Sequence, residues 1–136
     1  MKSLALTSTD LGAVRNVLGF FSPPDFQKIN PKALMEATGY SGTALAQELA
    51  VNRTRVYRET VSVSPAVQKA VFDLMIATDI AHSLVGGNTE ETKKWLVTPN
   101  LAFFGDTPFR ICLRGDGQTL IDWLKQRAGL VAGAAY

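Results

Sequence analysis

The chain has 136 residues, of which 46% are hydrophobic and 19% are charged, and this balance excludes a disordered, charge-rich chain. The formal net charge of +2 is too small to indicate a nucleic-acid binder by itself. The positive excess lies entirely in residues 1–60, which carry seven Lys and Arg against five Asp and Glu, while residues 61–136 carry seven of each sign.

Two short helices are predicted at the start of the chain. Residues 10–21 place apolar side chains at helical spacing behind Asp10, a suitable N-cap, and Ser22–Pro24 ends this helix. Asn30 followed by Pro31 is typical of a second helix start, and the apolar pattern continues toward Gly39. Either dimerisation or packing can be the role of residues 1–40.

Residues 42–59 have the pattern of a helix-turn-helix, the motif that places its second helix in the major groove of DNA. Ala46 is the small residue needed where the two helices cross. The apolar side chains that would lock the helices together are Leu49, Val51 and Val56. The turn carries Ala50 where glycine is usual, so a residue with a Cβ must make it, and Asn52 follows as an N-cap.

The second helix of this motif is predicted from Arg53 to Glu59. The DNA-binding residues expected on it are Arg53, Thr54, Tyr57 and Arg58, with Asn52 at its start and Arg55 toward the flank. Arginine pairs bidentately with guanine and also binds phosphate, so the segment suits operator DNA, bound by a dimer. The alternative is an ordinary helical hairpin whose arginines form a solvated face.

A long helix is predicted over residues 65–87, because Ser64 and Pro65 form a start signal and the apolar periodicity continues to Gly86. The next helix begins at Asn88 or Thr89, and its Trp95 and Leu96 are expected to face inward.

Turn residues divide the rest of the chain into short apolar runs. Residues 109–113 alternate like a strand but have no evident pairing partner, so we expect a short helix beginning at Pro108. Gly105 and Gly117 are expected to make turns closed to residues with a Cβ, and a last helix is predicted over residues 118–127.

Three stretches in the C-terminal half of the chain, taken in sequence order, resemble a known family. They are Trp95–Leu96 followed by Pro99–Asn100, then Phe104–Pro108, then Leu113–Gly117 before an amphipathic helix. Together they resemble the toxin-binding domain of the Xre/MbcA/ParS antitoxins, and the resemblance covers roughly residues 40–130, since that family has an Xre-like helix-turn-helix upstream. It implies a type II antitoxin that covers the active site of a RES-domain, NAD-depleting toxin and represses its own operon as a homodimer within a larger toxin–antitoxin assembly.

The toxin-binding residues expected from this reasoning are Trp95, Leu96, Phe104, Gly105, Pro108, Gly117, Leu130, Val131 and Tyr136. For the glycines, the proline and the aromatic residues, a purely structural role is the alternative. The tail from Leu130 to Tyr136 is too short for a helix of its own. It is predicted either to enter the substrate cleft of the toxin with its terminal carboxylate or to be a frayed end.

No enzyme, metal site or cofactor is expected. Cys112 is the only cysteine and His82 the only histidine, so neither a disulfide nor a metal-ligand cluster is available. Cys112 is expected to be a buried small hydrophobe, and His82 to be packed or solvated on the long helix. Asp10 and Arg15 interrupt the first apolar patch, so no signal peptide or membrane span is expected and the protein is predicted to be cytoplasmic and bacterial.

The sequence therefore predicts an all-α protein in three parts. An N-terminal region, residues 1–64, contains the helix-turn-helix; a connecting helix covers residues 65–87; a toxin-binding domain covers residues 88–136. Two other functions stay open: a stand-alone helix-turn-helix transcription regulator whose C-terminal half dimerises or senses a ligand, and a toxin partner whose N-terminal half only dimerises.

Overall fold

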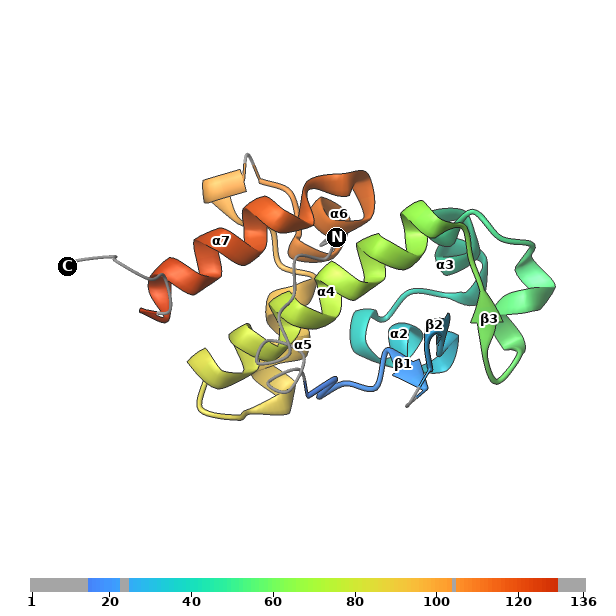
Figure 1. Ribbon diagram of the computed structural model, residues 1–136, viewed down its shortest axis with the longest axis horizontal. Helices are drawn as coiled ribbons and strands as arrows, with labels where there is room; N and C mark the ends of the chain where they lie inside the picture. The colour runs from blue at the N-terminus through green and yellow to red at the C-terminus, as the bar shows by residue number, and fades with distance from the viewer. Residues whose placement is uncertain (1–14, 23–24, 104, 130–136) are drawn as a thin grey trace.

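The computed structural model describes residues 15–22, 25–103 and 105–129 and is mainly helical (Figure 1), in agreement with the predicted class. Its elements in chain order are β1 (Phe21–Ser22), β2 (Asp25–Ile29), α2 (Pro31–Thr38), α3 (Gly42–Leu49), η1 (Arg53–Tyr57), β3 (Val61–Ser62), α4 (Pro65–Leu84), α5 (Thr89–Leu96), η2 (Leu101–Phe103), α6 (Pro108–Ile111), η3 (Cys112–Asp116) and α7 (Gly117–Arg127). The elements η1 and η2 are 3-10 helices, and η3 is a π turn.

The predicted helix starts are confirmed at three places. The side chains of Asn30, Ser64 and Asn88 accept hydrogen bonds from the backbone N–H three residues later, at 3.3, 3.3 and 3.0 Å. Pro31 and Pro65 occupy the first helical turn, where a missing N–H leaves no partner unsatisfied. These starts form because each cap satisfies its own helix locally.

The prediction of a helix over residues 10–21 is wrong for residues 15–21, which are the part of this range that the structure describes. Residues 15–20 form an irregular turn in which Asn16 has a φ of 54°, and β1 follows directly. The backbone N–H groups of Arg15, Asn16 and Val17 donate to the Asp79 carboxylate of α4 instead of to a helix. Residues 10–14 lie outside the described residues.

A small antiparallel sheet, which the sequence did not indicate, has the strand order β1-β2-β3. Phe21 pairs with Ile29, which in turn pairs with Val61, so all three strands contribute a buried apolar side chain at one position. Lys28 pairs with Ser62, and both side chains are exposed because alternate residues of a strand face opposite sides. The sheet therefore joins the start of the chain to the segment that precedes α4.

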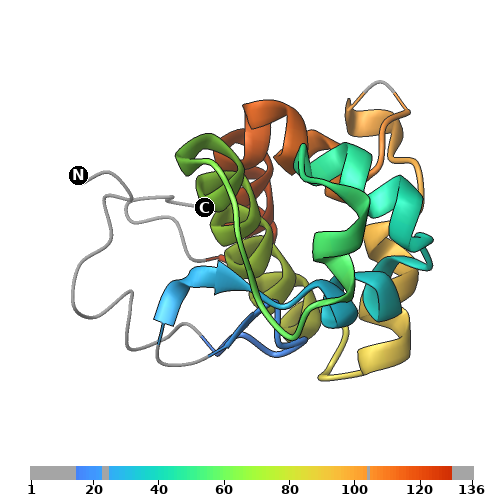
Figure 2. The same cartoon turned by 90° about the vertical axis from the view of Figure 1, so that its right-hand side faces the viewer.

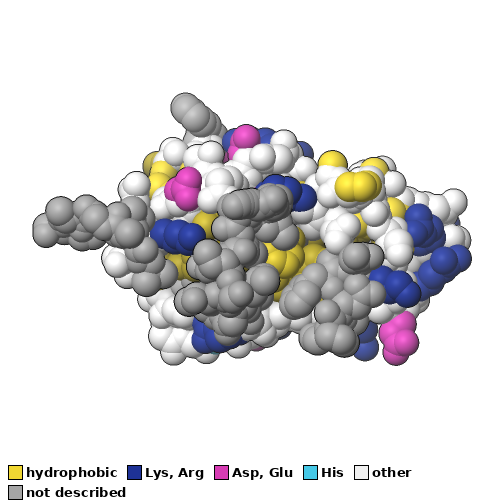
Figure 3. Space-filling model, viewed as in Figure 1, with side chains coloured by type: hydrophobic (Ala, Val, Ile, Leu, Met, Phe, Trp, Pro, Cys, Tyr) yellow, Lys and Arg dark blue, Asp and Glu magenta, His cyan; other side chains and the backbone are white. Residues whose placement is uncertain are grey.

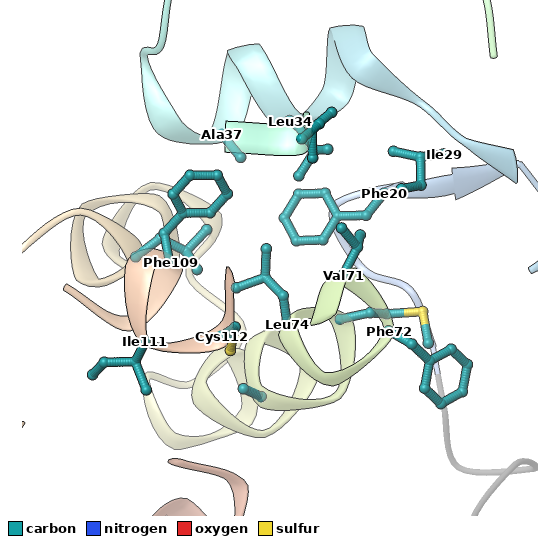
Figure 4. Close-up of a cluster of buried hydrophobic side chains, with 14 of the residues drawn as sticks. Phe20, Ile29, Leu34, Ala37, Val71, Phe72, Leu74, Phe109, Ile111 and Cys112 are labelled. Carbon is teal, nitrogen blue, oxygen red and sulfur yellow. The ribbon is translucent and has the colours of Figure 1, made fainter. Parts of the chain in front are cut away.

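The core is built around α4. Figures 1 and 2 both show α7 running alongside α4, whereas α2 and α3 pack against each other away from α7. In Figure 4 the side chains of Phe20, Leu34, Leu74 and Phe109 point toward one another from the segment before β1 and from α2, α4 and α6. All four are almost completely buried, so both halves of the chain contribute to a single hydrophobic cluster.

The helix predicted to begin at Pro108 is confirmed, and the strand interpretation of residues 109–113 is excluded. Thr107 caps α6 by accepting from the Arg110 N–H at 3.2 Å, and the helix widens into the π turn η3. Gly115 makes that turn with a φ of 100°. Gly117, predicted to make a turn, has an ordinary helical φ of −60°; it is needed because a Cβ there would lie 2.6 Å from the Asp73 Cβ of α4.

Within the described part of the chain, no helix combines the length and the apolar character needed to cross a membrane.

Candidate functional site

The segment from α3 to η1 is organised by two residues of its connecting turn. Ala50, expected to make the turn in place of glycine, adopts the left-handed conformation with φ 57° and ψ 44°, and its N–H donates to the Ala46 and Gln47 carbonyls of α3. Asn52 then caps η1 by accepting from the N–H and the hydroxyl of Thr54, both at 3.1 Å. Ala46 and two of the three predicted clamp residues, Leu49 and Val56, are buried in the hydrophobic cluster, and the third, Val51, is half-buried against it.

The second element of this segment differs from the prediction. It is a 3-10 helix that ends at Tyr57, and Arg58 is extended, with φ −81° and ψ 159°, instead of continuing an α-helix to Glu59. The chain must leave the helix here because β3 begins at Val61 and pairs with β2. A 3-10 helix is tighter than an α-helix, and runs longer than a few residues are uncommon.

The structure places four of the predicted DNA-binding side chains at the surface: Arg53, Thr54, Tyr57 and Arg58. Tyr57 is 69% exposed, and its hydroxyl end lies over Gly42, at the start of α3, where a Cβ would overlap it. Arg55 is half-buried and donates from Nη2 to the Ser62 carbonyl. Arg55 therefore fixes the loop between η1 and β3.

Two cations that the sequence reasoning missed lie beside this segment. Lys32, in the first turn of α2, lines an open hollow of about 780 Å³ together with Tyr57, Arg58 and Glu59. Lys28 is exposed on β2, two residues before Asn30, which lines the same hollow. The only sequence signal for them was the positive excess of the first half, because their proximity to η1 depends on how β2 pairs with β3.

The cations of this region form no ion pair within the described residues, unlike most of those in the second half. No described carboxylate lies within salt-bridge distance of Lys28, Lys32, Arg53 or Arg58. The paired cations are Lys69, Lys93, Lys94 and Arg114. Figure 3 shows Lys and Arg side chains gathered at the end of the molecule formed by η1 and β3. We call Lys28, Lys32, Arg53 and Arg58 together the basic end.

A second exposed feature is the turn between α5 and α6. Leu101, in η2, exposes 93% of its surface, although large apolar side chains are usually at least partly covered. The turn beneath it is fixed by Asn100, whose carbonyl accepts from the N–H groups of Phe103 and Gly105 at 2.9 and 3.0 Å. The side chain of Asn100 also accepts from the Ala102 N–H at 2.9 Å.

The base of the turn is tied to the rest of the C-terminal half. Asn100 and Asp106 form an isolated antiparallel bridge, and the Asp106 carboxylate pairs with the Arg114 guanidinium of η3. Phe103 is buried against Trp123 of α7, with ring centroids 5.4 Å apart. Leu101 is thus presented on a turn with many internal contacts, and sequence patterning could not indicate that it faces water.

The predicted toxin-binding residues are distributed between core and surface. Leu96, Pro108 and Gly117 are buried by the chain itself, so in this structure they offer no surface to a partner and their role is structural. Trp95 is half-buried, and Gly105 is exposed with a φ of 81°. The predictions for Phe104, Leu130, Val131 and Tyr136 lie outside the described residues.

The described residues include no cluster of three or more His, Cys, Asp or Glu that could hold a metal ion. Cys112 is completely buried, as predicted, and burial together with the nearby Asp73 carboxylate raises the pKa of its thiol. His82 is half-buried on α4. A neutral, inaccessible thiol is a poor nucleophile.

Comparison with known proteins adds no relative. No protein-family model, no curated protein and no solved structure matches the chain. The resemblance to the antitoxins therefore depends on the sequence motifs alone.

Proposed function

We propose that this protein is a type II antitoxin that binds operator DNA through its basic end and neutralises a RES-domain, NAD-depleting toxin through its C-terminal half. The observation that carries the proposal is the presence of two unlike exposed surfaces on one small chain. One is the basic end, and the other surrounds Leu101. In Figure 1 the green η1 and the orange η2 lie well apart along the long axis, which supports two separate binding surfaces for DNA and a protein partner.

The DNA-binding part is supported by chemistry and local geometry. Unpaired Lys and Arg side chains supply the phosphate contacts on which protein–DNA affinity largely depends. The order of α3, a left-handed turn at Ala50, the Asn52 cap and a second helical element with exposed Arg53 agrees with a short variant of a helix-turn-helix. Because η1 has only five residues, we expect base contacts to be few, and a homodimer to supply the remaining affinity.

The toxin-binding part is supported by the antitoxin-like motifs and by the way they fold. The glycines and prolines of these motifs shape the turns and close helix contacts that hold η2 and α6 in place. The hydrogen bonds of the turn already fix the backbone that carries Leu101, so binding a partner does not have to order this segment. Leu101 therefore has the properties of an anchor residue for a protein partner.

The test is to co-express the chain with the product of the adjacent reading frame and to measure the affinity of the purified pair. Leu101→Ala should weaken the pair about 30-fold, the loss of roughly 2 kcal/mol typical of an anchor residue. The matched control is Leu84→Ala, which shortens an exposed leucine at the end of α4 and should change affinity less than about threefold. Failure of the unaltered chain to retain the neighbouring product, with DNA binding intact, would instead favour the stand-alone regulator.

A further inference from the structure

We propose that the DNA contact extends beyond η1 to a phosphate-binding track formed by Lys28, Lys32 and Arg58, which follows the backbone of duplex DNA independently of its sequence. The inference rests on the proposed DNA-binding function. It assigns to β2 and α2 a part in binding that the helix-turn-helix pattern does not contain.

The three cations come from separate elements that the sheet brings together. Lys28 faces solvent because its neighbour Ile29 is buried, and it pairs with Ser62 of β3. Lys32 and Arg58 line the same open hollow from α2 and from the residue that follows η1. A strand advances about 3.3 Å per residue, so Lys28 lies within reach of the Asn30 edge of that hollow.

The chemistry of the hollow favours phosphate. Its lining residues include Lys32, Arg58 and Tyr57, whose side chains all carry hydrogen-bond donors. None of the three track cations forms an ion pair within the described part of the chain, so no carboxylate has to be displaced when DNA binds. We infer that the polyanion bound here is duplex DNA, because Arg53 and Thr54 of η1 continue the polar surface next to the track.

One residue that lines the hollow is acidic and weakens the binding of phosphate, so removing its charge should raise the affinity for DNA. Glu59 is exposed at the hollow and has no ion-pair partner among the described residues. Its carboxylate repels phosphate at short range. Glu59→Gln should consequently tighten binding of the chain to duplex DNA, by about twofold to fivefold at low salt.

The experiment measures the affinity of the whole chain for two 30-base-pair duplexes of unrelated sequence across a series of salt concentrations. Each lost phosphate contact lowers the slope of log K against log salt by about 0.9, so Lys28→Ala combined with Lys32→Ala should lower it by about 1.8, equally on both duplexes. The matched control is Lys93→Ala combined with Lys94→Ala, which removes the same charge from α5 and should leave the slope unchanged.

Equal effects of the two double variants would show that only net charge matters and would overturn the track. An unchanged slope in the Lys28 and Lys32 variant, or a loss confined to one duplex, would also overturn it while leaving DNA binding by η1 intact. Absence of duplex binding by the unaltered chain at low salt would contradict both the track and the DNA-binding part of the proposed function. Competition by poly-aspartate at equal charge would show that the surface prefers an acidic protein and would overturn the assignment to DNA.

Discussion

The Asp79 carboxylate on α4 holds the irregular segment at the start of the described chain, so changing it should destabilise the fold. Its Oδ2 accepts from the N–H groups of Arg15 and Asn16 at 2.7 and 3.1 Å, and its Oδ1 accepts from Val17 at 3.0 Å. The Arg15 guanidinium reinforces this by donating to the Asp79 carbonyl and to the Ser83 hydroxyl, at 3.1 and 2.8 Å.

The size of the effect follows from these bonds. A hydrogen bond to a charged group contributes about 1.5–3 kcal/mol. Arg15 is exposed, so its N–H bonds to water when the carboxylate is removed and we count no loss for it. The bonds from Asn16 and Val17, each taken at the lower value of about 1.5 kcal/mol, give a loss of about 3 kcal/mol for Asp79→Ala. Asp79→Asn keeps an acceptor toward Arg15 and Asn16 but turns an amide NH₂ toward the Val17 N–H, so we expect a loss of about 1.5–2 kcal/mol.

Thermal unfolding followed by circular dichroism measures these losses. For a chain of this length about 3 °C of Tm corresponds to 1 kcal/mol, so Asp79→Ala should lower Tm by about 9 °C. The control is Asp122→Asn on the exposed face of α7, where the carboxylate accepts from the exposed Gln118 side chain; it should cost less than about 0.5 kcal/mol. Equal stability of the Asp79→Asn variant and the unaltered chain would refute the reasoning.

Three further changes test other parts of the fold. Ala50→Gly should stabilise the chain by about 0.5–1 kcal/mol in urea unfolding, because the left-handed φ of 57° suits glycine. Gly117→Ala should destabilise it by about 1–3 kcal/mol, since the new Cβ would meet the immovable Asp73 Cβ, whereas Gly42→Ala meets only the mobile end of Tyr57 and should be nearly neutral. The raised pKa of the Cys112 thiol means that stability is unaffected by this group below its ordinary pKa of 9.0 and falls as the pH rises above it, by at most about 1.4 kcal/mol per pH unit.

Each of these changes has its own control. Ala44→Gly, within α3 and without a left-handed φ, should destabilise by about 0.5–1 kcal/mol, and the same sign for Ala44 and Ala50 would contradict the turn geometry. Gln118→Ala, exposed beside Gly117, should change little. Cys112→Ala should remove part of the alkaline loss, and rapid reaction of native Cys112 with a thiol reagent at neutral pH would contradict its burial.

Local signals made much of the helical fold predictable. The starts at Asn30, Ser64 and Asn88 each involve a cap that bonds to an N–H three residues away, so a short window of sequence contains the whole interaction. The helix at Pro108 was predictable for the same reason, because Thr107 caps it.

The errors occurred where a distant partner decides the conformation. Residues 15–17 have a helical apolar pattern, but their N–H groups are bound by Asp79, more than sixty residues later. The shortening of η1 likewise depends on the pairing of β3 with β2. No short-range pattern records either contact.

The candidate sites were predictable to different degrees. The exposed residues Arg53, Thr54, Tyr57 and Arg58 were predicted from the pattern around Asn52. Lys28 and Lys32 join them only through the tertiary fold. The exposure of Leu101 depends on the bridge between Asn100 and Asp106, which no periodicity reveals.

The most direct test of the antitoxin proposal is the rate of NAD consumption by the purified product of the adjacent reading frame, measured while this chain is titrated into the reaction. The account predicts that consumption falls with added chain and stops near stoichiometric amounts. With the toxin diluted below the inhibition constant, Leu101→Ala should raise that constant about 30-fold. NAD consumption that is unchanged by an excess of the folded chain would contradict it.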